Sequence, residues 1–305
     1  MNKKKYVNRN YLTTTRIIAL GFLITVIVGT ILLSLPIASA NGTWTDLLTA
    51  AFTSTTSVCV TGLAVVDTFS YWSLFGKGVI LILIQIGGLG IVSIITLFML
   101  LLRMKITLKS TMLLQDAFNL NSKQGLLKFT IKVIKGTFLI EGIGALIYSF
   151  YYCREYGFLK GIWFSVFHAV SAFCNAGIDI MGADSLISYH SNLLMMLNTS
   201  FLIIMGGIGF IVWWDTVEAF RRIRTKRCSI RSAWNGVHLQ TKIAIFMTLL
   251  LLIGGTIVIY FLERSNPDTL GNLSEKDRIL NAFFQSVTFR TAGFAAVSQV
   301  ALRPV

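Results

Sequence analysis

Three glycines stand at the same place in three similar segments of this 305-residue sequence: Gly62, Gly177 and Gly293. Each follows a phenylalanine by ten residues and precedes an apolar residue, and successive glycines are 115 and 116 residues apart. Because glycine lacks a Cβ, it permits backbone conformations that aim successive carbonyl oxygens at one axis. A ring of such oxygens can replace the hydration shell of a potassium ion. The pattern therefore indicates main-chain coordination of a dehydrated alkali cation.

A simpler interpretation is that these glycines only terminate short helices, a position where glycine is common. Helix termination readily explains one such segment. It explains less well why three segments share the same spacing and recur at nearly the same interval along the chain. Repeats of this kind indicate a structural unit that occurs several times in the chain.

A segment of about a dozen residues precedes each glycine and could be helical: residues 46–57, 161–173 and 277–289. At 1.5 Å per residue such a helix is about 18 Å long, too short for a hydrocarbon core of about 30 Å. Re-entrant loops of this type are tolerated in lipid only where they are buried in protein or line water. The partially negative C-terminal ends of the helices would favour a cation.

The elements that must position these loops are membrane spans. The sequence is 54% hydrophobic and only 13% charged, whereas soluble domains are about 25% charged. Five stretches are long and apolar enough, or nearly so, to cross a bilayer: Ile17–Leu35, Gly78–Leu102, Gly136–Tyr152, Leu193–Trp214 and Ile243–Leu262. The expected fold class is an all-α polytopic membrane protein.

The basic residues are unevenly distributed between the spans. Segments 1–16, 103–135 and 215–242 hold 19 of the 27 Lys and Arg residues and three of the 13 acids. Because cytoplasmic loops collect Lys and Arg, we expect the N-terminus to be cytoplasmic. The basic excess is then a topology signal, and we expect no nucleic-acid partner.

Enzyme and metal motifs do not occur. The sequence has no G-x-S-x-G, no P-loop and no paired-carboxylate constellation, and its four cysteines lack the spacing of a zinc site. We therefore expect neither an enzyme nor a metal centre beyond a transported K⁺, and no covalently bound cofactor.

The pore-loop motifs resemble those of the Trk/Ktr/HKT superfamily of potassium transporters, and most closely the membrane subunit of bacterial Ktr systems. The matching stretches are Ser57–Asp67, Gln85–Gly90, Ala172–Gly177 and Val287–Phe294, and the resemblance covers nearly the whole chain. The Ktr-like assignment depends on the first span starting near Arg16, with no extra helix pair before it.

The resemblance implies a pseudo-fourfold pore built from four tandem M1–P–M2 repeats, each a helix, a re-entrant pore loop and a second helix. It implies that filter carbonyls come from Val60, Thr61, Gly62, Asn175, Ala176, Gly177, Thr291, Ala292 and Gly293. Arg290 is expected to support the filter from behind, through hydrogen bonds to carbonyls or an acid, rather than to gate it. Glycine at position 62, where some plant relatives carry serine, fits preference for K⁺ over Na⁺.

About 2.5 of the four repeats are expected in this chain, which stops twelve residues after Gly293. The expected organisation is a basic cytoplasmic N-terminus (1–16), repeat 1 (17–103), a cytoplasmic linker (104–128), repeat 2 (129–222), a basic cytoplasmic linker (223–241) and an incomplete repeat 3 (242–305, M1–P only). We expect a C-terminal truncation.

The expected function is that of the ion-translocating membrane subunit of a potassium uptake system, channel-like and located in the bacterial plasma membrane. The alternatives are an alternating-access cation symporter, with Na⁺ as coupling or activating ion, and a truncated product that conducts nothing. Besides the bilayer, the resemblance implies a homodimer and cytosolic nucleotide-binding regulatory subunits as partners.

Two further features leave alternatives open. Glu141 lies in mid-span, where a charge costs at least about 2.5–3.5 kcal/mol, and it is either part of an ion pathway or a buried, paired carboxyl. The glycine pairs Gly87-Gly88 and Gly206-Gly207, followed by Gly90 and Gly209, indicate close helix packing more than hinge motion.

Overall fold

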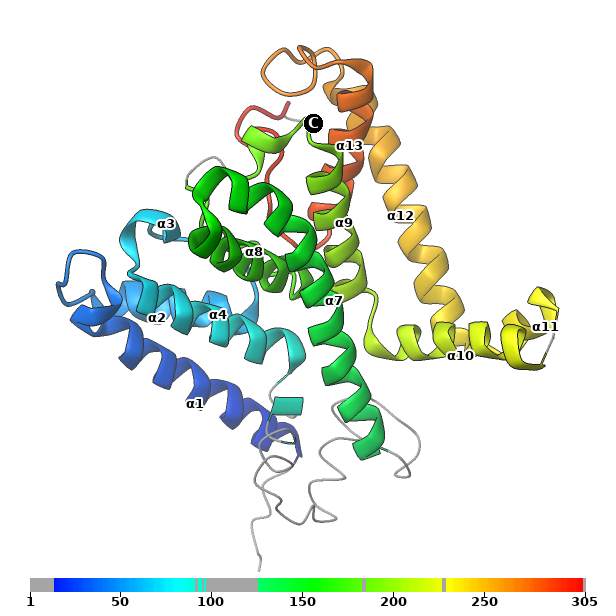
Figure 1. Cartoon of the computed structure of the whole chain (residues 1–305), viewed down its shortest axis with the longest axis horizontal. Coiled ribbons are helices and arrows are strands. Elements are labelled where there is room, and N and C mark those ends of the chain that lie inside the picture. The colour runs from blue at the N-terminus through cyan, green and yellow to red at the C-terminus, as the bar shows by residue number, and fades with distance from the viewer. Residues whose placement is uncertain are drawn as a thin grey trace, which may run out of the picture.

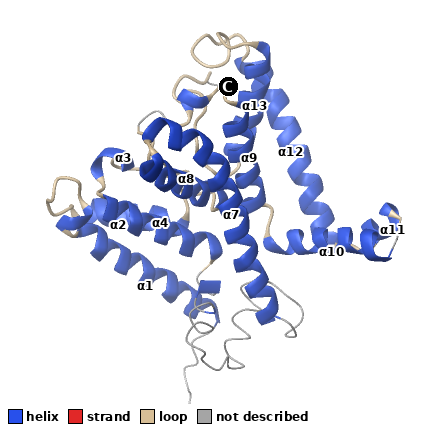
Figure 2. Cartoon of the chain, viewed as in Figure 1, coloured by secondary structure: helices blue, strands red, loops and turns tan. Residues whose placement is uncertain are grey.

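The computed structural model describes residues 14–90, 93–94, 96, 126–182, 185–226 and 229–303. Within these ranges the chain is helical and has no β-strand; one isolated bridge joins Ser39 to Trp72 (Figure 2). The prediction of an all-α fold is confirmed. The helices are α1 (Thr14–Ser34), η1 (Pro36–Ala38), α2 (Leu47–Cys59), α3 (Thr68–Tyr71), α4 (Leu74–Leu89), α7 (Leu126–Tyr156), α8 (Phe158–Phe173), η2 (Ile187–Tyr189), α9 (Leu193–Gly207), α10 (Phe210–Lys226), α11 (Ile230–Asn235), α12 (Leu239–Glu263) and α13 (Glu275–Thr288).

Three long helices, α1, α7 and α12, are long and apolar enough to cross a bilayer, and they contain three of the expected spans. Their outward faces are apolar rather than polar. On α12, for example, Phe246, Ile253 and Phe261 are 64%, 60% and 62% exposed. A helix that is apolar on every side belongs in a protein core or in lipid, so these exposed faces indicate a lipid environment.

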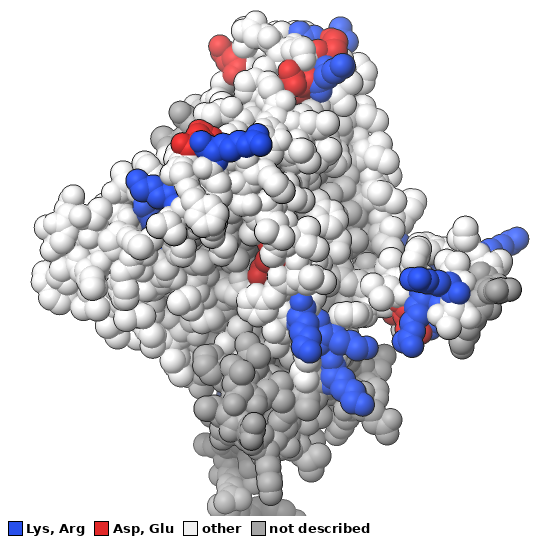
Figure 3. Space-filling model, viewed as in Figure 1, with Lys and Arg blue, Asp and Glu red and all other residues white. Residues whose placement is uncertain are grey.

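Charged side chains gather at two ends of the molecule, with an apolar belt between them (Figure 3). We define the basic end by Lys128 and Lys132 near the start of α7 and by Arg221 and Arg224 on α10. The opposite, mixed-charge end carries acids beside cations, including the ion pair between Arg278 and Glu275. This separation is what a membrane-crossing protein requires, because charge is costly in hydrocarbon.

Each long helix is followed by a short helix that packs against it: α2 on α1, α8 on α7 and α13 on α12 (Figure 1). Glycines and serines set two of these contacts. The Ser54 hydroxyl of α2 donates to the Val26 carbonyl of α1 (2.8 Å), and the Ser286 hydroxyl of α13 donates to the Leu252 carbonyl of α12 (2.9 Å). Small residues and interhelical hydrogen bonds hold helices together in lipid, where the hydrophobic effect does not.

The expected span Leu193–Trp214 is not one straight helix. The chain forms two helices, α9 and α10, that meet at an angle of 100°. The bend lies at Gly209, whose φ is +96°, a conformation that glycine adopts at little cost. A Cβ on Gly209 would meet nothing within 4 Å, so this glycine makes a hinge rather than a packing contact.

The four glycines of the two pairs pack closely, as predicted, whereas a Cβ on Gly90, like one on Gly209, would meet nothing within 4 Å. A Cβ on Gly87 would lie 2.2 Å from the Val58 carbonyl oxygen, and a Cβ on Gly206 would lie 1.7 Å from the Phe173 carbonyl oxygen. These two glycines let α4 and α9 touch the ends of α2 and α8. α4 itself ends at Leu89, followed by Gly90 at φ +78°. Most of the expected span beyond it, and all but the end of the expected linker 104–128, lie outside the described residues.

We expect Gly206→Ala to destabilise the protein by about 1–3 kcal/mol or more, because its methyl group has no space beside the Phe173 carbonyl. The melting temperature in detergent measures this effect. Gly254→Ala is the matched control, since a Cβ there meets nothing within 4 Å. Equal melting temperatures for the two variants would contradict the close contact.

Candidate cation-coordination site

The short helices α2, α8 and α13 end close to one another, and each leads into a loop that contains one of the three predicted glycines. Gly62, Gly177 and Gly293 all have left-handed backbone conformations, with φ of +75°, +62° and +82°. A side chain at any of them would be strained, which explains the residue type at each position.

The main chains of the three loops meet at these glycines. A Cβ on Gly62 would lie 2.8 Å from the Ala176 carbonyl oxygen, and a Cβ on Gly177 would lie 2.1 Å from the Ala292 carbonyl oxygen. A Cβ on Gly293 would lie 3.4 Å from the Gly177 Cα. Segments more than 110 residues apart in sequence are therefore in direct backbone contact, with carbonyl oxygens beside the neighbouring glycine.

Hydroxyl groups of the short helices fix each loop, a feature that the sequence analysis missed. The Thr56 hydroxyl accepts from the Leu63 N–H (3.0 Å), Ser171 donates to the Ile178 carbonyl (2.5 Å), and Thr288 donates to the Phe294 carbonyl (2.8 Å). In all three loops the partner is the residue directly after the glycine. Thr56 also bonds the Thr61 hydroxyl at 2.6 Å. The sequence signal was a hydroxyl five or six residues before each glycine.

Two residues that are not glycine also adopt left-handed conformations in these loops: Val60 (φ +56°) and Asn175 (φ +58°). Asparagine tolerates this region, whereas a β-branched residue there is an outlier. Strain of this kind costs of the order of 1–3 kcal/mol and concentrates at functional sites. Both residues stand two positions before their glycine.

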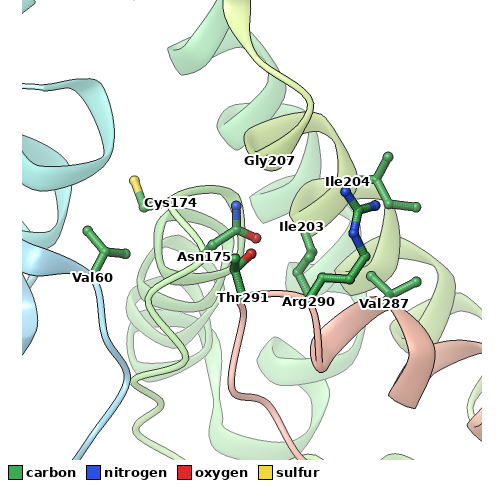
Figure 4. Close-up of a pocket in the computed structure, with 9 residues that line it drawn as sticks. All are labelled: Val60, Cys174, Asn175, Ile203, Ile204, Gly207, Val287, Arg290 and Thr291. Carbon is green, nitrogen blue, oxygen red and sulfur yellow. The ribbon is translucent and has the colours of Figure 1, made fainter. Parts of the chain in front are cut away.

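One cavity of ≈ 320 Å³ brings the three loops together (Figure 4). Its lining includes the residue two positions before the glycine in each loop, Val60, Asn175 and Thr291. The remaining lining residues come from the ends of α8, α9 and α13: Cys174, Ile203, Ile204, Gly207, Val287 and Arg290. Equivalent positions of three separate loops therefore face one space.

The side chain of Asn175 connects this cavity to the bend between α9 and α10. In the orientation that satisfies both ends of the amide, Asn175 donates to the Ile203 carbonyl (3.2 Å) and accepts from the Gly207 N–H (3.2 Å). A regular helix would pair these two backbone groups with each other. The Asn175 amide therefore ties the second loop to the last turn of α9, just before the bend.

The helix ends around the cavity have the polarity that a cation favours. Asp46 caps the N-terminus of α2 by accepting from the Leu48 and Thr49 N–H groups, and Ser274 caps α13 by accepting from the Asp277 N–H. The opposite, C-terminal ends of both helices adjoin the cavity, and each carries partial negative charge.

Arg290 lies at the edge of the cavity, one residue before Thr291. Its side chain is exposed and lines the cavity, with the guanidinium extending towards Ile204 (Figure 4). No hydrogen bond or ion pair joins this guanidinium to any other residue in the described ranges. That Arg290 supports the filter from behind stays a prediction.

Glu141 is buried (4% exposed) behind the second loop, and it does not line the cavity. Both of its carboxyl oxygens accept from the Gln85 amide of α4, at 3.1 and 3.2 Å. The Cys174 thiol lies 4.0 Å from one of them. Of the two readings of Glu141, this geometry favours the paired, buried carboxyl that joins α4, α7 and the loop after α8.

Comparisons with known proteins agree with this arrangement. A sequence model of the TrkH family, described as cation transport protein, matches residues 3–305. The potassium/sodium uptake protein NtpJ of Enterococcus hirae is 41% identical over 95% of this chain and 61% of its own length. The Ktr system potassium uptake protein B is 38% identical in Bacillus subtilis, over 99% of this chain and 65% of that protein, and 34% identical in Vibrio alginolyticus, over 92% and 59%.

The crystal structure of the potassium transporter TrkH from Vibrio parahaemolyticus has a similar fold, with a TM-score of 0.59 and 15% sequence identity. The match covers 97% of this chain and 54% of that structure. The chain thus spans about three-fifths of the length of the relatives it matches.

We expect Asn175→Gly to destabilise the protein by about 1–3 kcal/mol, because it leaves the Ile203 carbonyl and the Gly207 N–H without the bonds that Asn175 makes. Because glycine readily adopts the left-handed conformation of residue 175, the change in stability reports the loss of the Asn175 side chain alone. The matched control is Val60→Gly, which relieves backbone strain at φ +56° and removes no polar contact. We expect it to destabilise less than Asn175→Gly, although it loses a partly buried apolar side chain. Melting temperatures in detergent decide; equal destabilisation by the two variants would refute the bridging role.

We expect Glu141→Gln to retain fold and transport, because the amide has nearly the same shape and can still pair with Gln85. Glu141→Leu leaves the Gln85 amide without its partner, and should lower stability by about 1–3 kcal/mol. The measurements are melting temperature and ⁸⁶Rb⁺ uptake. Loss of uptake in a well-folded Glu141→Gln variant would instead favour a role in the ion pathway.

Proposed function

This chain belongs to the TrkH family of cation transport proteins, and we propose that it forms most of the ion-conducting subunit of a potassium uptake system. In this proposal K⁺ is dehydrated at the junction of the three loops. Backbone carbonyls of residues 60–62, 175–177 and 291–293 replace its water, and the ion moves down its electrochemical gradient.

The observation that carries this proposal is the cavity that Val60, Asn175 and Thr291 share. These residues occupy one register position in three loops, and the adjoining glycines are in backbone contact. Neutral main-chain oxygens, without an acidic ring, suit a dehydrated monovalent ion. A binding site made of side-chain ligands would not need matched left-handed glycines.

The proposal extends to the architecture. The units α1–α2–α4, α7–α8–α9 and α12–α13 correspond to repeats 1 and 2 and to the M1–P part of repeat 3, in the order of residues 17–103, 129–222 and 242–305. A pseudo-fourfold pore then needs the second helix of repeat 3 and a fourth repeat. The greater length of the relatives supports this reading, since the region they share with this chain is only about three-fifths of them.

The orientation and partners are also proposals. The basic end would face the cytoplasm, as Lys- and Arg-rich segments do, with a cytoplasmic N-terminus in a bacterial plasma membrane. Two relatives are components of a Ktr system by name, which supports assembly with further components. In this proposal the chain forms a homodimer with cytosolic nucleotide-binding subunits.

Sodium coupling is the second candidate. The Enterococcus hirae relative is named a potassium/sodium uptake protein, so Na⁺ can be a second transported or coupling ion. A carrier would saturate at low concentration with low flux, whereas a channel-like subunit would sustain high flux.

The test is ⁸⁶Rb⁺ uptake in a potassium-uptake-deficient bacterium that expresses this chain joined in frame to the C-terminal third of the Bacillus subtilis relative. We expect uptake that rises to high flux with the outside concentration, and none from the 305-residue chain alone. Tight saturation at low flux, with dependence on external Na⁺, would favour the symporter. Uptake by the short chain alone would refute the need for a fourth loop.

In the same chimera, alanine at the three glycines should reduce uptake in the order Gly177, Gly62, Gly293. This order follows the space for a Cβ, which is 2.1, 2.8 and 3.4 Å from its nearest neighbour. Gly142→Ala, where a Cβ meets nothing within 4 Å, is the control and should leave uptake unchanged. Equal uptake in all four variants would contradict a filter at these residues.

A further inference from the structure

A second cavity, of ≈ 360 Å³, lies between α7, the α9–α10 bend and α12, away from the three loops. We call it the α10 crevice. Its walls are apolar. They include Leu139, Ile140, Ile208, Val212, Trp213 and Ile245. Figure 1 shows α10 running across from α9 to the start of α12 at the basic end of the molecule.

The bend of the chain at Gly209 creates this crevice. Because α10 leaves α9 at 100°, α9 does not continue along the space between α7 and α12, and among the described residues this space is the crevice. Trp213 is fixed by a hydrogen bond from its indole N–H to the Met205 carbonyl (2.8 Å). The indole rings of Trp213 and Trp214 lie against α7 at Gly136, where a Cβ would be in ordinary contact with them, at 3.5 Å from one ring and 3.8 Å from the other.

Two lysines lie on the same face of α7 as the crevice wall. Lys128, Lys132, Gly136 and Ile140 follow one another at four-residue intervals, which places them in a row along the helix. Both lysines are exposed, and the Lys132 ammonium lies 5.3 Å from the centre of the Trp214 ring. This row begins with two cations at the basic end and continues into the apolar wall.

Two acids of α10, Asp215 and Glu218, stand next to residues that line the crevice, and both have partners. Glu218 forms an ion pair with Arg222 at 3.8 Å. Asp215 follows Trp214 and accepts hydrogen bonds from the Thr241 hydroxyl (2.6 Å) and His238 Nδ1 (2.8 Å) of the α12 region. These contacts hold α10 against α12, and leave the lysine charges on α7 unopposed by that carboxylate.

We propose that the α10 crevice binds one anionic phospholipid, with an acyl chain between α7 and α12 and the headgroup phosphate at Lys128 and Lys132. The apolar lining matches a hydrocarbon chain, and the two cations match a phosphate at headgroup level. A zwitterionic lipid fits the apolar walls equally well but carries no net charge for the lysines. A bound chain would fill the space beneath the hinge at Gly209 and stabilise α10 in its bent position. This proposal does not depend on which ion the protein transports.

The test uses the purified, delipidated chain in a neutral detergent, titrated with phosphatidylglycerol or with phosphatidylcholine of the same acyl chains. Native mass spectrometry gives the bound fraction and the apparent Kd of the first bound lipid. We expect phosphatidylglycerol to bind at least tenfold more tightly than phosphatidylcholine. Glycerol phosphate, which has the charge without the chains, should not compete at equal concentration.

Three variants locate the site. In Lys128→Gln/Lys132→Gln, the affinity for phosphatidylglycerol should fall by about 30-fold, the size of two lysine–headgroup attractions, to the level of phosphatidylcholine. Gly136→Leu, which places a side chain in the crevice, should weaken binding of both lipids. The matched control Lys160→Gln/Lys276→Gln removes two exposed lysines near the mixed-charge end and should change nothing. Each variant is first checked for an unchanged melting profile without lipid.

Equal affinity for the two lipids would overturn the proposal. So would a loss in the control double variant as large as that in Lys128→Gln/Lys132→Gln, because the lysine effect would then be general surface charge. Unchanged phosphatidylglycerol binding in Gly136→Leu would place the lipid elsewhere. If the α7 double variant alters the melting profile, Lys132→Gln alone serves, with an expected loss of about fivefold.

Discussion

The structure depends on one constraint: backbone that leaves a helix at membrane depth must have its polar groups satisfied within the protein. The three loops after α2, α8 and α13 meet this constraint in the same way. A hydroxyl from the last turns of each short helix bonds the main chain just beyond the glycine. These bonds hold each loop where its glycine has a left-handed φ and no helix or sheet hydrogen bonds support the chain. The carbonyls of Ala176 and Ala292 then lie beside the glycine of the neighbouring loop.

The need for close contact between helices in lipid explains why small residues recur where the short helices meet their neighbours. Gly87 and Gly206 allow α4 and α9 to touch the carbonyl ends of α2 and α8, while Gly29 and Gly255 make room for the serines of α2 and α13. In lipid, helices associate through close contact and interhelical hydrogen bonds. Substituting larger residues at these points would separate the short helices from their neighbours, and the loops they carry would no longer meet.

Asn175 links two features that are otherwise separate. It has a left-handed backbone in the second loop, its side chain faces the shared cavity, and its amide bonds Ile203 and Gly207 just before the hinge. A change in the position of α10 therefore reaches this loop through two hydrogen bonds. The crevice beneath the hinge, with its apolar walls and its row of lysines, is where a lipid would act on the same element. The bent pair of α9 and α10 therefore joins the cavity of the three loops to the basic end of the molecule.

The sequence by itself determined the helical class, the lipid-facing character, the three long spans and the three short helices, because apolar length, charge distribution and glycine spacing are local properties. Family membership also followed from motifs that are contiguous in the chain. Sequence could not determine that α9 and α10 bend at Gly209, because an uncharged run of residues looks the same whether the helix is straight or broken. Nor could it determine the surroundings of Arg290 or the pairing of Glu141 with Gln85. Those depend on which segments meet in space, and only the packing of helices more than 50 residues apart in sequence decides that.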